Sequence, residues 1–240
     1  MATATLVPAD STRPQLIAPV RHTLALIVLF ALLTASGALF QSRAQSHPAI
    51  TDHHPNVLPL YLSLIAAEWG LFYYIWKGGL KKSGTSVRSL IGGRWSSGRD
   101  LLADALLAAA MWGVWAAFTL GWERWMAPGH AASVQSMLPQ GALEAGLWIA
   151  LSISAGICEE AVFRGYFQSQ LHAWTGSRWI ALALQALLFG ISHGYQGVTA
   201  CFKIALYGAF FGAIALWRRS LRPGMMAHAW TDIASGLLFR

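Results

Sequence analysis

Long apolar runs separated by short polar segments dominate the chain. Each run approaches the length needed to cross a bilayer. The runs cover residues 22–40, 57–76, 101–122, 143 into the 160s, 179–194, 198–217 and 223–239. The apolar positions are continuous and do not alternate with polar ones, which favours helices over the strands of a barrel. The pattern therefore predicts an all-α polytopic membrane helical bundle with about seven (seven to eight) transmembrane helices.

The first run admits two interpretations, a signal peptide or a first transmembrane helix. Its apolar part is longer than the 7–15 residues of a typical signal-peptide core, and further runs follow it. We therefore expect a transmembrane helix. The expected organisation is a cytoplasmic amino-terminal tail over residues 1–21 and a single transmembrane domain over residues 22–240.

Composition supports a membrane protein, because 55% of the residues are hydrophobic and only 11% are charged. Soluble domains carry about 25% charged residues. The net charge is +7, but Lys and Arg cluster in short segments between apolar runs, so no nucleic-acid partner is expected. The two cysteines, Cys158 and Cys201, form neither a disulfide framework nor a zinc motif.

Basic residues lie in alternate loops. They precede the first run or follow the second, fourth and sixth: Arg13, Arg21; Lys77, Lys81, Lys82, Arg88, Arg94, Arg99; Arg178; Arg218, Arg219, Arg222. Lys and Arg are enriched in cytoplasmic loops. We expect an integral protein of the cytoplasmic (inner) membrane with its amino terminus in the cytoplasm and its carboxyl terminus outside.

A few ionisable residues stand inside the apolar runs, where a charge costs about 2.5–3.5 kcal/mol on insertion scales. They are Glu68, Glu159, Glu160, Arg164, His193, His228 and Asp232, with Asp104 near the start of a run. Residues of this kind are usually paired or functional. Glu68 and Asp104 lack partners in the sequence and are interpreted as structural or cavity-lining residues.

The two neighbouring glutamates Glu159 and Glu160, the acidic pair, are expected to have different roles, because they point in different directions on a helix. Glu160 and Arg164 are four residues apart on one face, the spacing of an ion pair. Glu159 is turned about 100° away. We expect Arg164 to hold Glu160, while Glu159 projects into a cavity as a candidate general base.

His193 and His228 are both predicted to lie at the same depth in the membrane as Glu159. Glu159 precedes Gly176 by 17 residues and His193 follows it by 17, so the equal arms of a helical hairpin would place them at one depth. His228 and Asp232 are spaced to share a helix face, where the carboxylate can fix the imidazole tautomer. Each feature alone is more often structural. Their convergence favours a functional site within the membrane, nearer the cytoplasm.

Three motifs on successive late runs resemble the CAAX protease and bacteriocin-processing (CPBP, Abi) family, which includes the type II CAAX prenyl endopeptidases. They are Glu159-Glu160-x-x-x-Arg164, Phe189-x-x-x-His193 and His228-x-x-x-Asp232. The resemblance covers roughly residues 143–240. It implies a helical intramembrane endopeptidase that acts on a membrane-associated peptide or protein, with the lipid bilayer as its environment.

The resemblance also implies residue roles. Glu159 and His193 would activate water, and His228 with Asp232 would stabilise the oxyanion. The supporting residues would be Glu160, Arg164 and Phe189. Asp232 departs from the family's common Asn, and an ionised Asp cannot donate to an oxyanion. We therefore expect Asp232 to orient His228, which makes the donation itself.

Two other functions remain open. In a zinc-dependent membrane peptidase, Glu159, His193 and His228 would be the metal ligands. Two observations speak against zinc: the HExxH motif is missing from the sequence, and the positive charge of Arg164 would repel a metal cation. We therefore expect an enzyme without a cofactor. The other alternative is a non-proteolytic membrane scaffold or immunity protein that uses the same cavity. The sequence does not identify the substrate.

Overall fold

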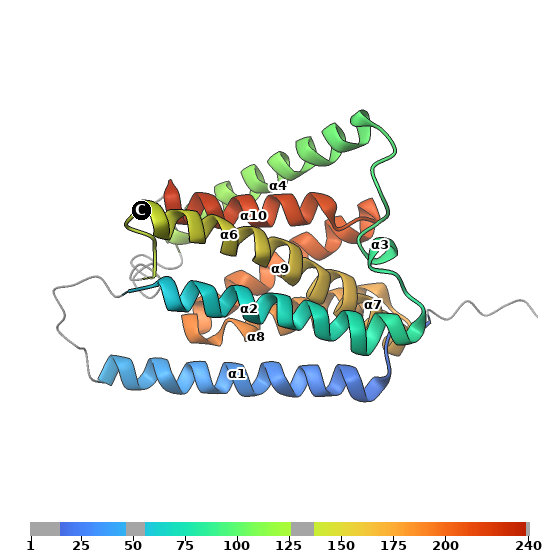
Figure 1. The fold of residues 1–240 in the computed structure, drawn as a ribbon, viewed down its shortest axis with the longest axis horizontal. Coiled ribbons are helices and arrows are strands. Elements are labelled where there is room, and N and C mark those ends of the chain that lie inside the picture. The colour runs from blue at the N-terminus through green and yellow to red at the C-terminus, as the bar shows by residue number, and fades with distance from the viewer. Residues whose placement is uncertain (1–14, 47–55, 126–136, 239–240) are drawn as a thin grey trace, which may run out of the picture.

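The computed structural model describes residues 15–46, 56–125 and 137–238, and every regular element within them is helical (Figure 1). Most of the predicted amino-terminal tail and residue 239 of the last predicted run lie outside the described residues. The α-helices are α1 (Val20–Ser46), α2 (Leu58–Tyr74), α3 (Val87–Leu90), α4 (Gly98–Trp125), α6 (Ala142–Glu159), α7 (Gln168–Thr175), α8 (Arg178–Ser192), α9 (Val198–Arg218) and α10 (Arg222–Leu237). Tighter or wider helical segments are η1 (Ile75–Gly79), η2 (Leu80–Ser83), η3 (Glu160–Phe167) and η4 (Gly194–Gln196). The prediction of an all-α chain is confirmed for these residues.

Five helical stretches of the described chain are long and apolar enough to cross a membrane. They are Val20–Gly37, Leu58–Ser83, Gly98–Trp125, Ala142–Thr175 and Val198–Arg218. The other two predicted spans correspond to α8 and α10, which have 15 and 16 residues, fewer than the roughly 20 that a spanning helix needs. The chain is an integral membrane protein, and the predicted count of seven spans is not confirmed.

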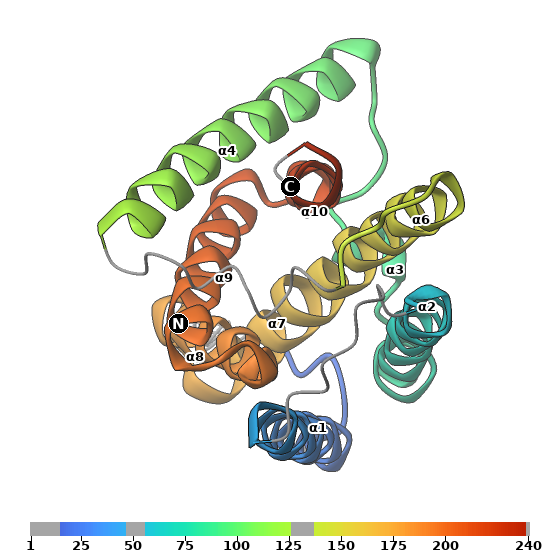
Figure 2. The same cartoon turned by 90° about the vertical axis from the view of Figure 1, so that its left-hand side faces the viewer.

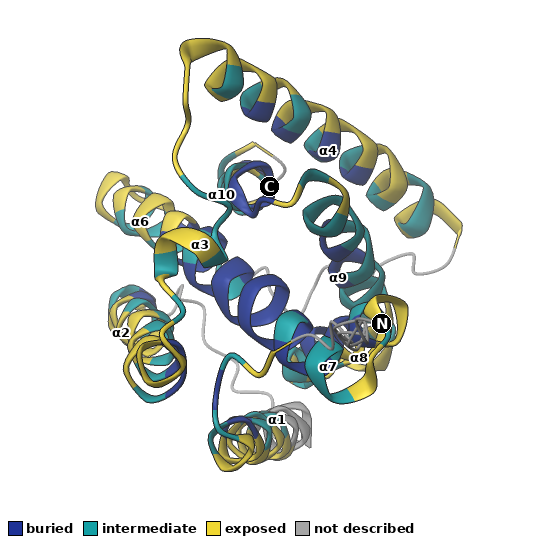
Figure 3. Ribbon diagram, turned by 90° about the vertical axis from the view of Figure 1, so that its right-hand side faces the viewer, coloured by how far each residue is buried: buried dark blue, intermediate teal, exposed yellow. Residues whose placement is uncertain are grey.

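The stretch Ala142–Thr175 is the central helix of the bundle and consists of α6, η3 and α7. Half of its most apolar window is buried, against 11–22% for the other four candidate spans. Figure 2 shows the other helices arranged around it, and Figure 3 shows buried residues concentrated along it. The buried side chains of this helix are therefore shielded from lipid by the rest of the fold, whereas Leu143, Ile149 and Ile153 near its start are exposed.

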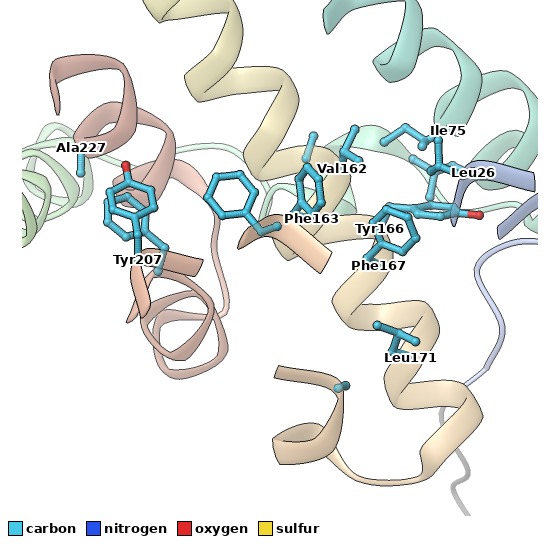
Figure 4. Packing of buried hydrophobic residues seen from close by; sticks show 14 of the residues in the cluster. Leu26, Ile75, Val162, Phe163, Tyr166, Phe167, Leu171, Tyr207 and Ala227 are labelled. Atoms are coloured by element: carbon cyan, nitrogen blue, oxygen red, sulfur yellow. The ribbon is translucent and has the colours of Figure 1, made fainter. Parts of the chain in front are cut away.

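Aromatic side chains fill the space beside the central helix. The ring of Phe163 lies 5.2 Å from that of Phe30 on α1 and 4.9 Å from that of Phe189 on α8. Figure 4 shows this core extending from Tyr207 through Phe163 to Phe167. Aromatic contacts of this kind stabilise a fold beyond simple burial, so α1, α8 and α9 are held against the central helix.

The middle of the central helix, η3, is π-helical. The spacing of Glu159, Glu160 and Arg164 was interpreted above with α-helical geometry. All eight residues of η3 are buried. A Cβ added to Gly165 would lie 2.9 Å from the side chain of Leu90 and 3.0 Å from that of Leu221. Short π segments occur often at functional sites. Here the π segment begins at Glu160, the second member of the acidic pair.

Asp104 is a structural residue that attaches α4 to the α9–α10 turn. Its fully buried carboxylate lies 2.9 Å from Arg218 Nη2 and 3.0 Å from Arg222 Nε. Trp95 Nε1 donates a hydrogen bond to it at 2.8 Å. The carboxylate is thus neutralised and hydrogen-bonded, as a buried charge requires. Asp104 belongs to this cluster and not to the acidic pair of the central helix.

Gln170 anchors the start of α1 to the central helix. Its Oε1 accepts hydrogen bonds from the backbone N–H groups of Ile17 at 3.0 Å and Ala18 at 3.2 Å. Its Nε2 donates to the carbonyl of Ala18 at 2.8 Å. Gln170 is completely buried, so these backbone groups have no water to replace the amide.

Gln170→Leu is therefore expected to destabilise the protein, because each buried polar group left unsatisfied costs about 1–3 kcal/mol. Thermal unfolding in detergent should show a lower melting temperature, and limited proteolysis should show faster cleavage near residue 18. The exposed Gln140→Leu is the matched control. Equal melting temperatures for the two variants would contradict the anchoring role.

Candidate active site

The segment η3 places Glu160 and Arg164 in a buried ion pair. Arg164 Nη1 lies 3.3 Å from Glu160 Oε1, and the two side chains are 0% and 1% exposed. The Arg164 guanidinium also lies over the ring of Phe189, 4.0 Å from its centroid. A cation over an aromatic face is attracted by the ring's quadrupole. The predicted pairing of Glu160 with Arg164 is confirmed, and Phe189 packs directly beside it.

Helix α10 brings His228 onto the same carboxylate. His228 Nδ1 lies 2.9 Å from Glu160 Oε1, and a carboxylate can only accept, so Nδ1 carries the proton. Close packing of α6 against α10 makes this possible, because a Cβ on Gly156 would lie 2.8 Å from the carbonyl oxygen of Met225. A buried chain Arg164–Glu160–His228 results.

The interaction that fixes the His228 tautomer differs from the prediction. Residue spacing predicted Asp232, four residues on, for this role, but Asp232 Oδ2 lies 3.6 Å from His228 Nε2, beyond hydrogen-bonding distance. Glu160 makes the short contact, from a different helix. The register between α6 and α10 sets this arrangement, and residue spacing within α10 cannot report it.

Glu159 and Asp232 face the free nitrogen of His228. Glu159 Oε2 lies 3.6 Å from Nε2, the same separation as Asp232 Oδ2. Their side chains are 17% and 34% exposed, whereas that of Glu160 is 1% exposed. The acidic pair is therefore divided as expected. Glu160 is enclosed, and Glu159 lies at the more open side of the imidazole.

His193 stands at the end of α8, next to Phe189. Its Nδ1 donates a hydrogen bond to the carbonyl of Phe189 at 2.9 Å, and its ring centroid lies 4.9 Å from that of Phe189. The Nε2 atom therefore keeps its lone pair in the neutral imidazole. Within the described chain, no hydrogen bond or ion pair joins His193 to Glu159. His193 is thus placed beside Phe189, and its predicted meeting with Glu159 stays a prediction.

Two further residues approach the acidic side of the site. Glu68 on α2 lies near Glu159 and interacts with it electrostatically. Tyr195, in η4, interacts electrostatically with Glu159 and Asp232. The apolar surroundings of Glu68 were the only sequence signal for it, and they gave no partner. Nothing in the sequence pattern indicated Tyr195, since a tyrosine in a short turn is unremarkable.

The arrangement bears on the zinc alternative. Among the described residues, no group of three or more His, Cys, Asp and Glu side chains is positioned to hold a metal ion. The suggested ligands Glu159, His193 and His228 do not form such a group. The site instead brings together in space the Glu159 carboxylate, the Nε2 atom of His228 and the buried guanidinium of Arg164. This combination is suited to acid–base chemistry.

Comparison with known proteins bears on the carboxyl-terminal part of the chain. Residues 141–234 match the model of a family described as type II CAAX prenyl endopeptidase Rce1-like. The matched range includes all seven residues of the three motifs, and the family is the one that these motifs resemble. No curated protein and no solved structure matches the chain.

Proposed function

We propose, from the match of residues 141–234 to a CAAX-type membrane endopeptidase family, that the chain hydrolyses a peptide bond of a membrane-associated protein or peptide. The observation that carries the proposal is the convergence of three carboxylates on His228, at 2.9 Å for Glu160 and 3.6 Å for Glu159 and Asp232. Buried ionisable groups in a membrane mark functional sites by default.

Glu159 is the proposed general base. It is more open than Glu160, and Arg164 is already engaged by Glu160. Glu159 removes a proton from water as the water oxygen bonds to the peptide carbonyl carbon. The same proton then passes to the leaving amine as the C–N bond breaks. His193 positions the water, because its free Nε2 can accept a hydrogen bond from it.

His228 is the proposed oxyanion donor. Its Nδ1–H is held by Glu160, which leaves Nε2 as the group that faces the reacting atoms. A protonated Nε2 can donate to the developing negative oxygen, and such donors are worth about 2.7–4 kcal/mol in acyl-transfer enzymes. Arg164 and Glu160 keep the imidazole in place. The Asp232 carboxyl group, 3.6 Å from Nε2, favours the donating form of the ring.

The proposed topology follows the distribution of basic residues. The amino terminus lies in the cytoplasm of a cell bounded by an inner membrane, and α8 and α10 complete seven crossings as the two shortest spans. The site then lies within the membrane, nearer its cytoplasmic face. Cleavage needs no metal ion in this proposal, so chelators should leave the rate unchanged.

Terminal proteomics of membranes tests the proposal. Membranes that contain the native chain should produce at least one protein terminus that is lost with Glu159→Ala. The matched control is Glu123→Ala, which removes an exposed glutamate paired with Lys203 at 3.3 Å. A phenotype of the chain that survives replacement of both Glu159 and His193 would instead favour the scaffold or immunity function.

Glu68→Leu is expected to lower kcat about tenfold with KM unchanged, because it removes a polar side chain that interacts electrostatically with Glu159, and tenfold corresponds to about 1.4 kcal/mol. Glu68 is a positioning residue in this proposal, since it acts through Glu159. Glu68→Gln keeps a polar group beside Glu159 and should recover most of the rate. Steady-state kinetics on a peptide identified by proteomics would measure both variants, and wild-type kcat for Glu68→Leu would contradict the role.

A further inference from the structure

A cavity borders η3 between α7, the first residue of α8 and the end of α9. Its volume is about 170 Å³, room for on the order of ten waters. Its charged and titratable lining residues are all basic: Arg164, His172, Arg178 and Arg219. Asp and Glu do not contribute to it. The cavity is therefore suited to an anion.

The arginines of this cavity are short of partners. Arg178 and Arg219 are exposed, and neither forms an ion pair with an acidic residue within the described chain. Arg164 is 2% exposed, and its Nε and Nη2 atoms lack hydrogen-bond partners among the described atoms. Buried donors are normally satisfied. The Arg164 guanidinium, however, is directed at Glu160 and the ring of Phe189, so the arginines available to a ligand in this cavity are Arg178 and Arg219.

Arg219 occupies a backbone position that disfavours an arginine. Its φ is 53°, and it is the only residue other than glycine with a positive φ in the described chain. It ends α9 in the left-handed conformation, which is usually taken by glycine. Strained backbone positions cluster at ligand clamps and other functional sites. Here the side chain is a guanidinium that lines the cavity.

Exposed tryptophans place the cavity at a membrane surface. Trp179 and Trp217 are 62% and 71% exposed and stand next to the cavity residues Arg178 and Leu216. Tryptophan is enriched where hydrocarbon meets water. Basic pockets between membrane helices at that level bind phosphate headgroups, and the fork of an arginine matches two phosphate oxygens.

We propose that this cavity binds the phosphate of an anionic phospholipid headgroup, with Arg178 and Arg219 as the principal ligands. The acyl chains would leave the cavity along the apolar surface beside Trp179 and Trp217. The same chemistry would admit free inorganic phosphate, and the experiment separates these two sources. The cavity borders Arg164 of the proposed peptidase centre, but binding by Arg178 and Arg219 does not depend on the proposed catalytic function.

Thermal unfolding of the full-length protein in neutral-detergent micelles tests the proposal. Micelles are doped with phosphatidylglycerol or phosphatidylcholine, or receive inorganic phosphate at the same concentration. Phosphatidylglycerol alone should raise the melting temperature. Arg178→Gln and Arg219→Gly should each need about tenfold more phosphatidylglycerol for half of the shift, the loss expected for one charge-assisted hydrogen bond.

Two variants separate headgroup binding from structural damage. Arg219→Gly removes the guanidinium but relaxes the backbone, so its melting temperature without lipid should not fall. Arg99→Gln removes an exposed arginine outside the cavity and should respond to phosphatidylglycerol like the native chain. Native responses of both cavity variants would overturn the proposal. A shift of equal size with inorganic phosphate, lost in the same variants, would overturn the assignment to a lipid and identify free phosphate as the ligand.

Discussion

Glu159→Gln is expected to lower kcat for peptide hydrolysis by about a hundredfold to ten-thousandfold, the usual contribution of a general base. Glutamine has nearly the same shape as glutamate but cannot take a proton from water. KM should change little, because the substrate's contacts are not removed. Steady-state kinetics of the purified protein, on a peptide identified by membrane proteomics, measures both constants.

Folding of this variant must be checked alongside its kinetics. Glu159 makes no ion pair shorter than 3.6 Å in the described structure, so its melting temperature in detergent should stay close to that of the native chain. Glu123→Gln is the matched control and should retain native kcat. A folded Glu159→Gln protein that cleaves at the native rate would remove Glu159 from the mechanism.

Arg164→Met is expected to destabilise the protein by about 3–5 kcal/mol, because it leaves a buried carboxylate without its cation. Glu160 is 1% exposed, and the guanidinium also packs on Phe189 at 4.0 Å. For a chain of this size the loss corresponds to a fall of about 10 °C in melting temperature. Thermal unfolding in detergent measures it.

A double variant distinguishes charge pairing from packing. Glu160→Gln combined with Arg164→Met removes both charges and should recover part of the lost stability, while cleavage stays impaired because His228 loses its carboxylate partner. If the double variant is no more stable than Arg164→Met, the loss is due to packing. An unchanged melting temperature for Arg164→Met would contradict the ion pair altogether.

Much of the fold can be predicted from the apolar runs, because hydrocarbon leaves few alternatives to a helix. All seven runs are helical where the structure describes them. The number of crossings is harder to predict. The runs that became α8 and α10 look like spans in sequence, but their helices have only 15 and 16 residues, and sequence patterns locate helix ends poorly.

Contacts between helices account for what the sequence could not predict. The pairing of Glu160 with Arg164 is local and was predicted correctly. The contact of His228 with Glu160 depends on how closely α10 approaches α6 at Gly156, which spacing within one helix does not encode. The same holds for Glu68, whose partner Glu159 lies on another helix.

The predicted meeting of Glu159 and His193 at one depth stays a prediction. Equal arms on either side of Gly176 presuppose a uniform α-helical rise, whereas one arm contains the π-helical residues Glu160–Phe167. In the described chain, His193 lies beside Phe189 and donates a hydrogen bond to its carbonyl. Counting residues from Gly176 therefore does not by itself fix the depth of His193 relative to Glu159.

In the proposed mechanism, water activated by Glu159 attacks the peptide carbonyl directly. Intact-protein mass spectrometry of a rapidly quenched single turnover, run in heavy-oxygen water, tests this step. We expect that the mass of the chain never increases and that the new carboxyl terminus carries the heavy oxygen. A chain that transiently carries the acyl part of the substrate would contradict it, because a protein nucleophile would then have attacked first.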